Sequence, residues 1–160
     1  MAIKKTSQLE RRKILRQFLG RYYRAKQRKI NLLFRLSELR RERDGLGGKP
    51  PSADNIHGKG QTSDRTAATA HRILDIEDRI DKQIKEQTDA VTEIMDMIDH
   101  LRPGSTEREI IELRHIDCLE WPEIEKRIHL TKSPCFEHYN KGLDQLLELR
   151  WVRERIGLEK

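Results

Sequence analysis

The sequence predicts an all-α protein, in which a long N-terminal helical hairpin or coiled coil precedes a three-to-four-helix unit that contains a helix-turn-helix. Apolar residues recur at intervals of three and four over most of the 160 residues, which is the period of amphipathic helices. Hydrophobic residues make up 35% of the chain and charged residues 38%, so these helices should keep wet outer faces. Gly and Pro cluster in residues 45–63 and at Pro103-Gly104, where we expect the helices to be interrupted.

The first region, residues 1–44, is predicted to be basic and to form one long helix from residue 6 to residue 44. Gly20 is the only Gly inside this helix, and it costs about 1 kcal/mol relative to Ala, which makes it the place for a bend or a break. The apolar stripe consists of Leu9, Ile14, Leu15, Phe18, Leu19, Tyr22, Tyr23, Ile30, Leu33, Leu36 and Leu39.

Residues 45–63 are expected to be a Gly/Pro-rich linker, and residues 64–102 a second long helix capped near Ser63 or Asp64. Sustained spacing of three and four over about four heptads is the coiled-coil pattern. An antiparallel hairpin with the first helix and a homodimeric seam both agree with it. The predicted stripe is Ile73, Ile76, Ile80, Ile84, Gln87, Val91, Ile94, Ile98 and Leu101.

Residues 103–160 are predicted to form the helix-turn-helix unit. Thr106 with Glu109 fits a capping box at the start of its first helix, which ends at a turn near Asp117-Cys118. Pro residues are tolerated in the first turn of a helix, and Pro122 and Pro134 occupy such positions. The remaining elements are a helix over 120–128, a turn over 129–131 and a final helix over 133–155.

The spacing within this helix pair separates an inward face from an outward face. We expect the inward side chains to be Leu119, Ile124, Ile128, Leu130, Cys135, Tyr139 or its neighbour His138, Leu143 and Leu146. In such units the early residues of the second helix enter the major groove of DNA. The outward face would hold Asp144 and the candidate DNA-binding residues, which with Arg127 of the preceding helix are Lys132, Ser133, Phe136, Glu137, Asn140 and Lys141.

Positive charge is concentrated at the N-terminus. Residues 1–44 hold fifteen Lys and Arg against four Asp and Glu, whereas residues 103–160 hold ten against twelve. A concentrated basic arm favours a polyanion or an acidic protein surface as partner, although a solvated coiled-coil face is the alternative. The candidates for sequence-independent contact with nucleic acid are Arg11, Arg12, Arg16, Arg24, Lys26, Arg28 and Lys29.

The run RHIDCLEWPEIEKRIHLTKSPCFEHYNKGLDQLL, residues 114–147, resembles region four of bacterial sigma factors. It is more similar to the sigma-like module of phage late-transcription regulators of the ArpU/RinA type, whose order of long helix, polar break, second long helix and sigma-like unit is also similar. The resemblance implies a transcriptional regulator, an activator of phage or prophage genes, that binds double-stranded DNA or docks on RNA polymerase in the bacterial host cytoplasm. Three residues depart from that pattern, namely Glu125 and Gly142 at positions usually held by Ala, and Glu137 where Arg or Gln is common.

Other functions find less support in the sequence. No run of about 18 apolar residues is present, so no membrane partner is expected. Cys118 and Cys135 have no standard spacing for zinc ligands, and both are expected to be buried small hydrophobes, with no metal or cofactor. No pattern indicates an enzyme. The alternative to a sequence-reading regulator is a helical interaction or packaging-adaptor protein, whose basic arm binds nucleic acid or acidic protein without reading sequence.

Overall fold

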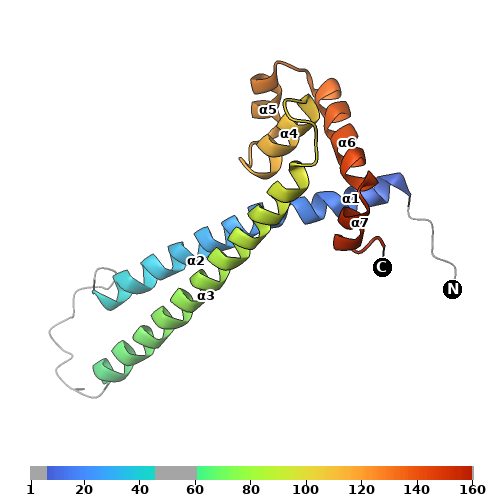
Figure 1. Cartoon of the computed structure of the whole chain (residues 1–160). Helices are drawn as coiled ribbons and strands as arrows, with labels where there is room; N and C mark the ends of the chain where they lie inside the picture. The colour runs from blue at the N-terminus through green and yellow to red at the C-terminus, as the bar shows by residue number, and fades with distance from the viewer. Residues whose placement is uncertain (1–6, 46–60, 160) are drawn as a thin grey trace. The chain divides into compact units, whose positions relative to one another are not determined.

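The computed structural model describes residues 7–45 and 61–159, and for residues 61–65 it describes the backbone alone (Figure 1). Every regular element in these ranges is an α-helix, which confirms the all-α prediction. None of the helices described combines the length and the apolar character that a bilayer crossing requires. The helices are α1 (Gln8–Leu19), α2 (Arg21–Arg43), α3 (Gln61–Ile98), α4 (Thr106–His115), α5 (Trp121–Ile128), α6 (Lys132–Glu148) and α7 (Arg150–Arg155).

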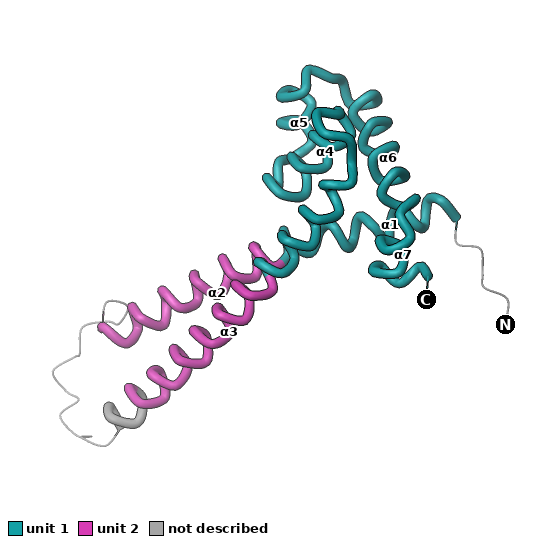
Figure 2. The backbone as a smooth tube through the Cα atoms, in the orientation of Figure 1, with its two compact units in different colours: residues 1–24, 87–160 teal, residues 25–86 magenta. Residues whose placement is uncertain are grey.

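The chain divides into two compact units, coloured separately in Figure 2. Residues 25–86 form a unit that contains most of α2 and α3, which we call the hairpin unit. Residues up to 24 and from 87 onward form the core unit, which joins α1 and the end of α3 to helices α4–α7. The first part of the basic region therefore packs with the C-terminal helices. Most of the expected linker, residues 46–60, lies outside the described residues.

Gly20 separates α1 from α2. It follows the last residue of α1 with φ −73° and ψ −1°, and its N–H group donates to the carbonyl of Arg16. A Cβ atom at this position would lie 2.9 Å from the guanidinium of Arg24 and 3.3 Å from the Arg16 carbonyl oxygen. The expected single helix is thus two helices, and the break falls at the residue that the sequence indicated.

Within the hairpin unit α2 and α3 run antiparallel. Arg40 pairs with Glu77, whereas the earlier Arg28 pairs with the later Glu86. This confirms the antiparallel packing for these residues, and the homodimeric seam stays a prediction. The apolar contacts between the helices come from Leu32, Leu36, Leu39, Ile73, Ile76 and Ile80.

The apolar stripe of α3 differs from the prediction at Ile84, whose side chain is 45% exposed. The seam instead continues from Ile80 through Gln83, which is half-buried. A step of three residues rather than four keeps the heptad phase, and it places a polar amide where the sequence pattern favoured Ile. In the stripe predicted for the first long helix, which is now α1 and α2, several residues are also exposed, namely Leu9, Tyr23, Ile30 and Leu33.

The core unit is built around one apolar cluster to which every helix except α2 contributes fully buried side chains. The N-terminal α1 supplies Leu15 and Leu19. Burying side chains of this size stabilises a fold by about 1.5–3 kcal/mol each. The other fully buried members are Ile94, Met97, Ile98, Ile110, Ile111, Ile124, Cys135, Leu143, Leu146 and Val152.

Helix boundaries in the core unit correct the sequence analysis at two points. The residue that caps α4 is Ser105, whose hydroxyl accepts from the N–H of Arg108, one residue before the expected Thr106. The predicted helix over 133–155 is interrupted at Leu149, whose ψ of 121° is extended. Arg153 compensates, because its guanidinium donates to the carbonyls of Leu147 (2.8 Å) and Glu148 (2.7 Å) at the end of α6.

Helices α4 and α6 cross closely at Gly142. A Cβ atom there would lie 2.7 Å from Cδ1 of Ile111 and 3.2 Å from Cβ of Glu107. The first contact is closer than real Cβ atoms approach, so a side chain at residue 142 requires the Ile111 side chain or α4 to shift. The Gly that departs from the sigma-like pattern is therefore explained by packing.

We expect Gly142→Val to lower the free energy of unfolding by about 2–3 kcal/mol, because the added methyl groups overpack the crossing. Gln145→Val, on an exposed position of the same helix, introduces the same β-branched side chain and should change stability by less than about 1 kcal/mol. Urea unfolding of the two variants measures both quantities. Equal losses would show that the crossing at Gly142 tolerates a larger residue.

Candidate nucleic-acid interface

The turn between α5 and α6 has defined geometry. Helix α5 begins after Glu120, whose N–H donates to the carboxylate of Glu123 at 3.0 Å. It ends at Ile128, and the next residue, His129, adopts the left-handed conformation with φ 55° and ψ 36°. The Leu130 N–H then donates to the carbonyl of Glu125, and Thr131 precedes α6. The predicted helix over 120–128 and the turn over 129–131 are thus confirmed to within one residue.

The inward face of this helix pair is largely as expected, with Ile124, Cys135, Tyr139 and Leu143 buried. Phe136 departs from the prediction. Its ring packs against Trp121 with centroids 4.2 Å apart, so it is half-buried instead of outward-facing. The reason is that Trp121 lies at the start of α5 and offers an aromatic surface to the first turns of α6.

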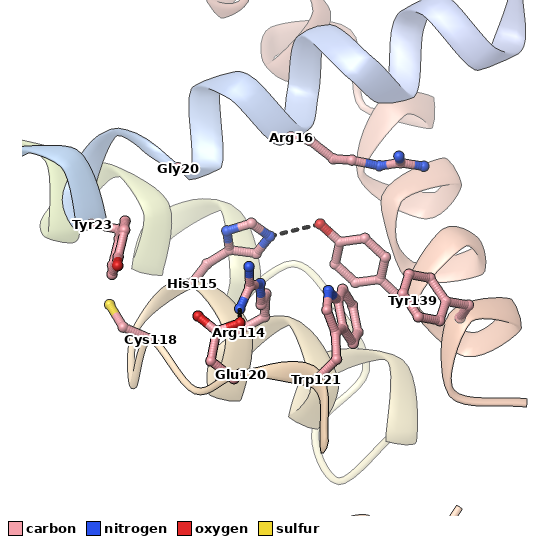
Figure 3. Close-up of a pocket in the computed structure, with 10 residues that line it drawn as sticks. Arg16, Gly20, Tyr23, Arg114, His115, Cys118, Glu120, Trp121 and Tyr139 are labelled. Atoms are coloured by element: carbon pink, nitrogen blue, oxygen red, sulfur yellow. Dashed lines mark hydrogen bonds and ion pairs between the residues drawn. The ribbon is translucent and has the colours of Figure 1, made fainter. Parts of the chain in front are cut away.

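A buried hydrogen-bond network holds α6 to α4 and α1, and Figure 3 shows its side chains. His115 Nε2 lies 2.8 Å from the hydroxyl of Tyr139, and the ring also bonds the backbone carbonyl of Leu19 at the end of α1. Burial lowers the pKa of His115 to about 3, so the imidazole is neutral. Its Nδ1–H therefore donates to Leu19, and Nε2 accepts from Tyr139.

Helix α1 lies across the C-terminal half of α6. The guanidinium of Arg12 donates to both carboxylate oxygens of Asp144, at 2.7 and 2.5 Å, and Gln8 donates to the same carboxylate at 2.7 Å. The hydrogen bond from Arg12 holds the pKa of Asp144 below its usual value. Arg16 donates to the amide oxygen of Asn140 at 2.9 Å. Asn140 and Asp144, which the sequence analysis placed on the outward face, are consequently half-buried.

Several of the N-terminal cations that were predicted to contact nucleic acid are also less exposed to solvent than expected. Arg12 was predicted on a wet face, but its ion pair with Asp144 leaves it half-buried. Arg11, Lys26 and Lys29 are half-buried as well. Helix packing explains the correction, because side chains that flank the contact surface of a packed helix are partly covered by the neighbouring helix. The exposed members of the predicted set are Arg16, Arg24 and Arg28.

Lys141 lies on the surface but serves an internal carboxylate. Its ammonium is 2.8 Å from Glu107, which is buried on α4, and His138 lies 3.1 Å from the same carboxylate. The hydrogen bond from Lys141, opposed by burial, lowers the pKa of Glu107 to about 2. Lys141 thus pairs with the only carboxylate among the buried residues of α4, and His138 lies within hydrogen-bond distance of the same carboxylate.

The surface that remains available surrounds the turn and the first turns of α6. We call it the α5–α6 edge and define it as Lys126, Arg127, Lys132, Ser133 and Glu137. All five are exposed, and within the described ranges none has a side-chain hydrogen bond or ion pair. Sequence reasoning missed Lys126, although its place one residue before Arg127 was a signal that could have found it.

The cysteines do not form a site. Cys135 is buried, and burial together with the nearby Glu125 carboxylate raises the pKa of its thiol. Cys118 is half-buried with φ 60°, so the prediction that both cysteines are buried was wrong for this one. In the part of the chain that the structure describes, no three His, Cys, Asp or Glu residues gather in a way that could hold a metal ion.

The burial of neutral His115 should make stability depend on pH. Its folded pKa of about 3 lies below the ordinary 6.5, so the unfolded chain binds a proton that the folded chain does not. This contribution is complete above about pH 6.5 and is lost as the pH falls toward 3, by about 1.4 kcal/mol per pH unit. Between pH 7 and pH 5 we expect a loss of about 2 kcal/mol in the free energy of unfolding.

His115→Gln should remove this component of the pH slope in denaturant titrations. Tyr139→Phe is the matched control, because it removes one hydrogen bond at the same place and leaves the imidazole buried. It should lower stability by about 1 kcal/mol at every pH and keep the slope. The assignment of the slope to His115 fails if the Gln variant and the wild-type chain have the same pH dependence.

Comparison with known proteins adds no relative: no family model, no curated protein and no solved structure matches this chain.

Proposed function

We propose that this protein is a transcriptional regulator that binds double-stranded DNA through the α5–α6 edge. The observation that carries the proposal is the start of α6, where Lys132 and Ser133 are exposed and unpaired beside a capped turn. A helix fits the major groove of DNA, and in helix-turn-helix units the first residues of the second helix reach the base edges. The cations of α5, Lys126 and Arg127, would contact the flanking phosphates.

The charge of the edge sets the strength of this interaction. Three cations, Lys126, Arg127 and Lys132, stand against the carboxylate of Glu137. Each phosphate contact contributes a salt-dependent increment to binding, so three cations support only modest affinity. Glu137 would repel phosphates, but a carboxylate at a base edge can accept from the amino group of cytosine. Specificity would then come from α6, and further affinity from cations elsewhere in the chain.

The resemblance to phage regulators supports the biological side of the proposal. A sigma-like unit would activate phage or prophage genes in the cytoplasm of a bacterial host, at a promoter or on RNA polymerase.

A second candidate function, a non-enzymatic interaction or packaging-adaptor protein, is favoured by a different observation. Helix α2 exposes three large apolar side chains, Ile30, Leu33 and Phe34, which would suit a protein partner.

Removal of a single cation from the edge tests the proposed interface. We expect Lys132→Ala and Arg127→Ala each to weaken duplex binding and to reduce the slope of log K against log salt by about 0.9. Arg102→Ala is the matched control, because Arg102 is an exposed cation of the core unit outside the edge. Fluorescence anisotropy over a salt series measures both quantities. If both edge variants keep the wild-type slope of log K against log salt, the α5–α6 edge does not contact DNA. Phe136→Ala is unsuitable here, since it would disturb the packing on Trp121.

Glu137→Arg separates a DNA-facing position from a polymerase-facing one. If residue 137 faces DNA, the change should raise affinity for random duplex by about tenfold at low salt, because it exchanges a repelling charge for a phosphate-pairing group. If it faces RNA polymerase, duplex binding should stay constant while activation in a reporter assay falls. A variant that matches the wild type in both assays would place Glu137 outside the functional surface.

A further inference from the structure

A groove between α2 and α3 in the hairpin unit is lined by four cations. The hollow measures about 350 Å³, and its cationic walls are Arg28 and Arg35 on α2 with Arg79 and Lys82 on α3. Glu86 is the one carboxylate among the groove-lining residues described. The groove thus has a local net charge of +3, although α3 as a whole is acidic.

The register of the hairpin brings like charges together in this groove. Arg28 pairs with Glu86 across the helices at 3.6 Å. Arg35 lies two turns further along α2, and Arg79 lies two turns back along the antiparallel α3. These two residues therefore occupy the positions that correspond to Arg28 and Glu86, but both are cations. If these positions served only to stabilise the hairpin, we would expect opposite charges here, like those of the ion pair between Arg40 and Glu77.

The cations of the groove are available for a ligand. Within the described ranges the side chains of Arg35, Arg79 and Lys82 have no hydrogen bond or ion pair, and all three residues are exposed. This distinguishes them from Arg12 and Arg16 of α1, which bond α6. Like charges facing each other without an intervening anion are destabilising, and a bound anion would remove that repulsion.

We propose that this groove binds the phosphodiester backbone of nucleic acid. Arg28 and Arg35 are separated by about 10 Å along α2, which is far enough for the two guanidinium groups to contact different phosphates of one strand. Guanidinium groups match phosphate oxygens with two parallel hydrogen bonds, and a line of them suits a continuous polyanion. The choice of nucleic acid as the polyanion rests on the proposed function, whereas the presence of an anion site rests on the groove alone.

The test compares two double variants with equal loss of charge. Arg35→Gln with Arg79→Gln neutralises the groove, and Arg41→Gln with Lys85→Gln neutralises exposed cations on the same two helices outside it. Binding to a short duplex of random sequence is measured by anisotropy over a salt series. We expect the groove variant to lose about tenfold in affinity at low salt with a slope smaller by about 2, and the control to lose less than about threefold. The groove variant should melt no lower than the wild-type chain, because it loses a repulsion.

The remaining outcomes of this experiment each overturn one claim: the groove as a site, nucleic acid as its ligand, or the α5–α6 edge as an interface. Equal losses of duplex affinity in both double variants would overturn the groove site and show that only the total positive charge matters. Unchanged duplex binding with lost binding of a polyglutamate peptide would overturn nucleic acid and assign an acidic protein. If the groove variant loses duplex affinity while Lys132→Ala does not, the groove stands and the proposed α5–α6 interface fails. The reverse result retains that interface and overturns the groove.

Discussion

The burial of Leu15 and Leu19 within the apolar cluster of the C-terminal helices is the contact on which the core unit depends. Both side chains are fully buried, and they come from the beginning of the chain while most of their neighbours come from beyond residue 90. Their burial lays α1 over the C-terminal half of α6, where Arg12 and Arg16 then complete polar contacts. Helix α1 is therefore part of the core rather than a separate basic arm, and it covers Asn140 and Asp144 of α6 while Lys132, Ser133 and Glu137 at the start of that helix stay exposed.

This arrangement divides the cations of the chain into two groups. Some stabilise the fold, among them Arg12 with Asp144 and Lys141 with the buried Glu107. Without Lys141 and His138, an unpaired carboxylate would remain among the buried residues of α4, so these contacts have a structural role whatever the protein binds. Others have no side-chain partner among the residues described, and these include Lys126, Arg127 and Lys132 at the α5–α6 edge and Arg35, Arg79 and Lys82 in the groove of the hairpin unit. The net charge of +6 does not separate these groups.

Close approach of α4 and α6 has a second consequence. The crossing at Gly142 brings His115 of α4 within 2.8 Å of the hydroxyl of Tyr139, so a hydrogen bond replaces the water that both groups lose on burial. The same imidazole bonds the end of α1 at Leu19. A neutral His with one donor and one acceptor nitrogen satisfies both partners, and it leaves no charge in the core. The position of α6 is thus determined by packing and by polar satisfaction together.

The sequence by itself determined the helical class, the break at Gly20, the turn at 129–131 and the inward residues of the helix pair. These depend on local rules, such as apolar period and the conformational limits of Gly, which act within a few residues. The tertiary structure decided which of two adjacent positions, Gln83 or Ile84, continues the seam, and it decided that Phe136 packs on Trp121. It also decided that α1 covers Asn140 and Asp144. These outcomes depend on contacts between residues far apart in the chain. The period of apolar residues and the number of charges in a segment do not reveal which distant residue a side chain will contact.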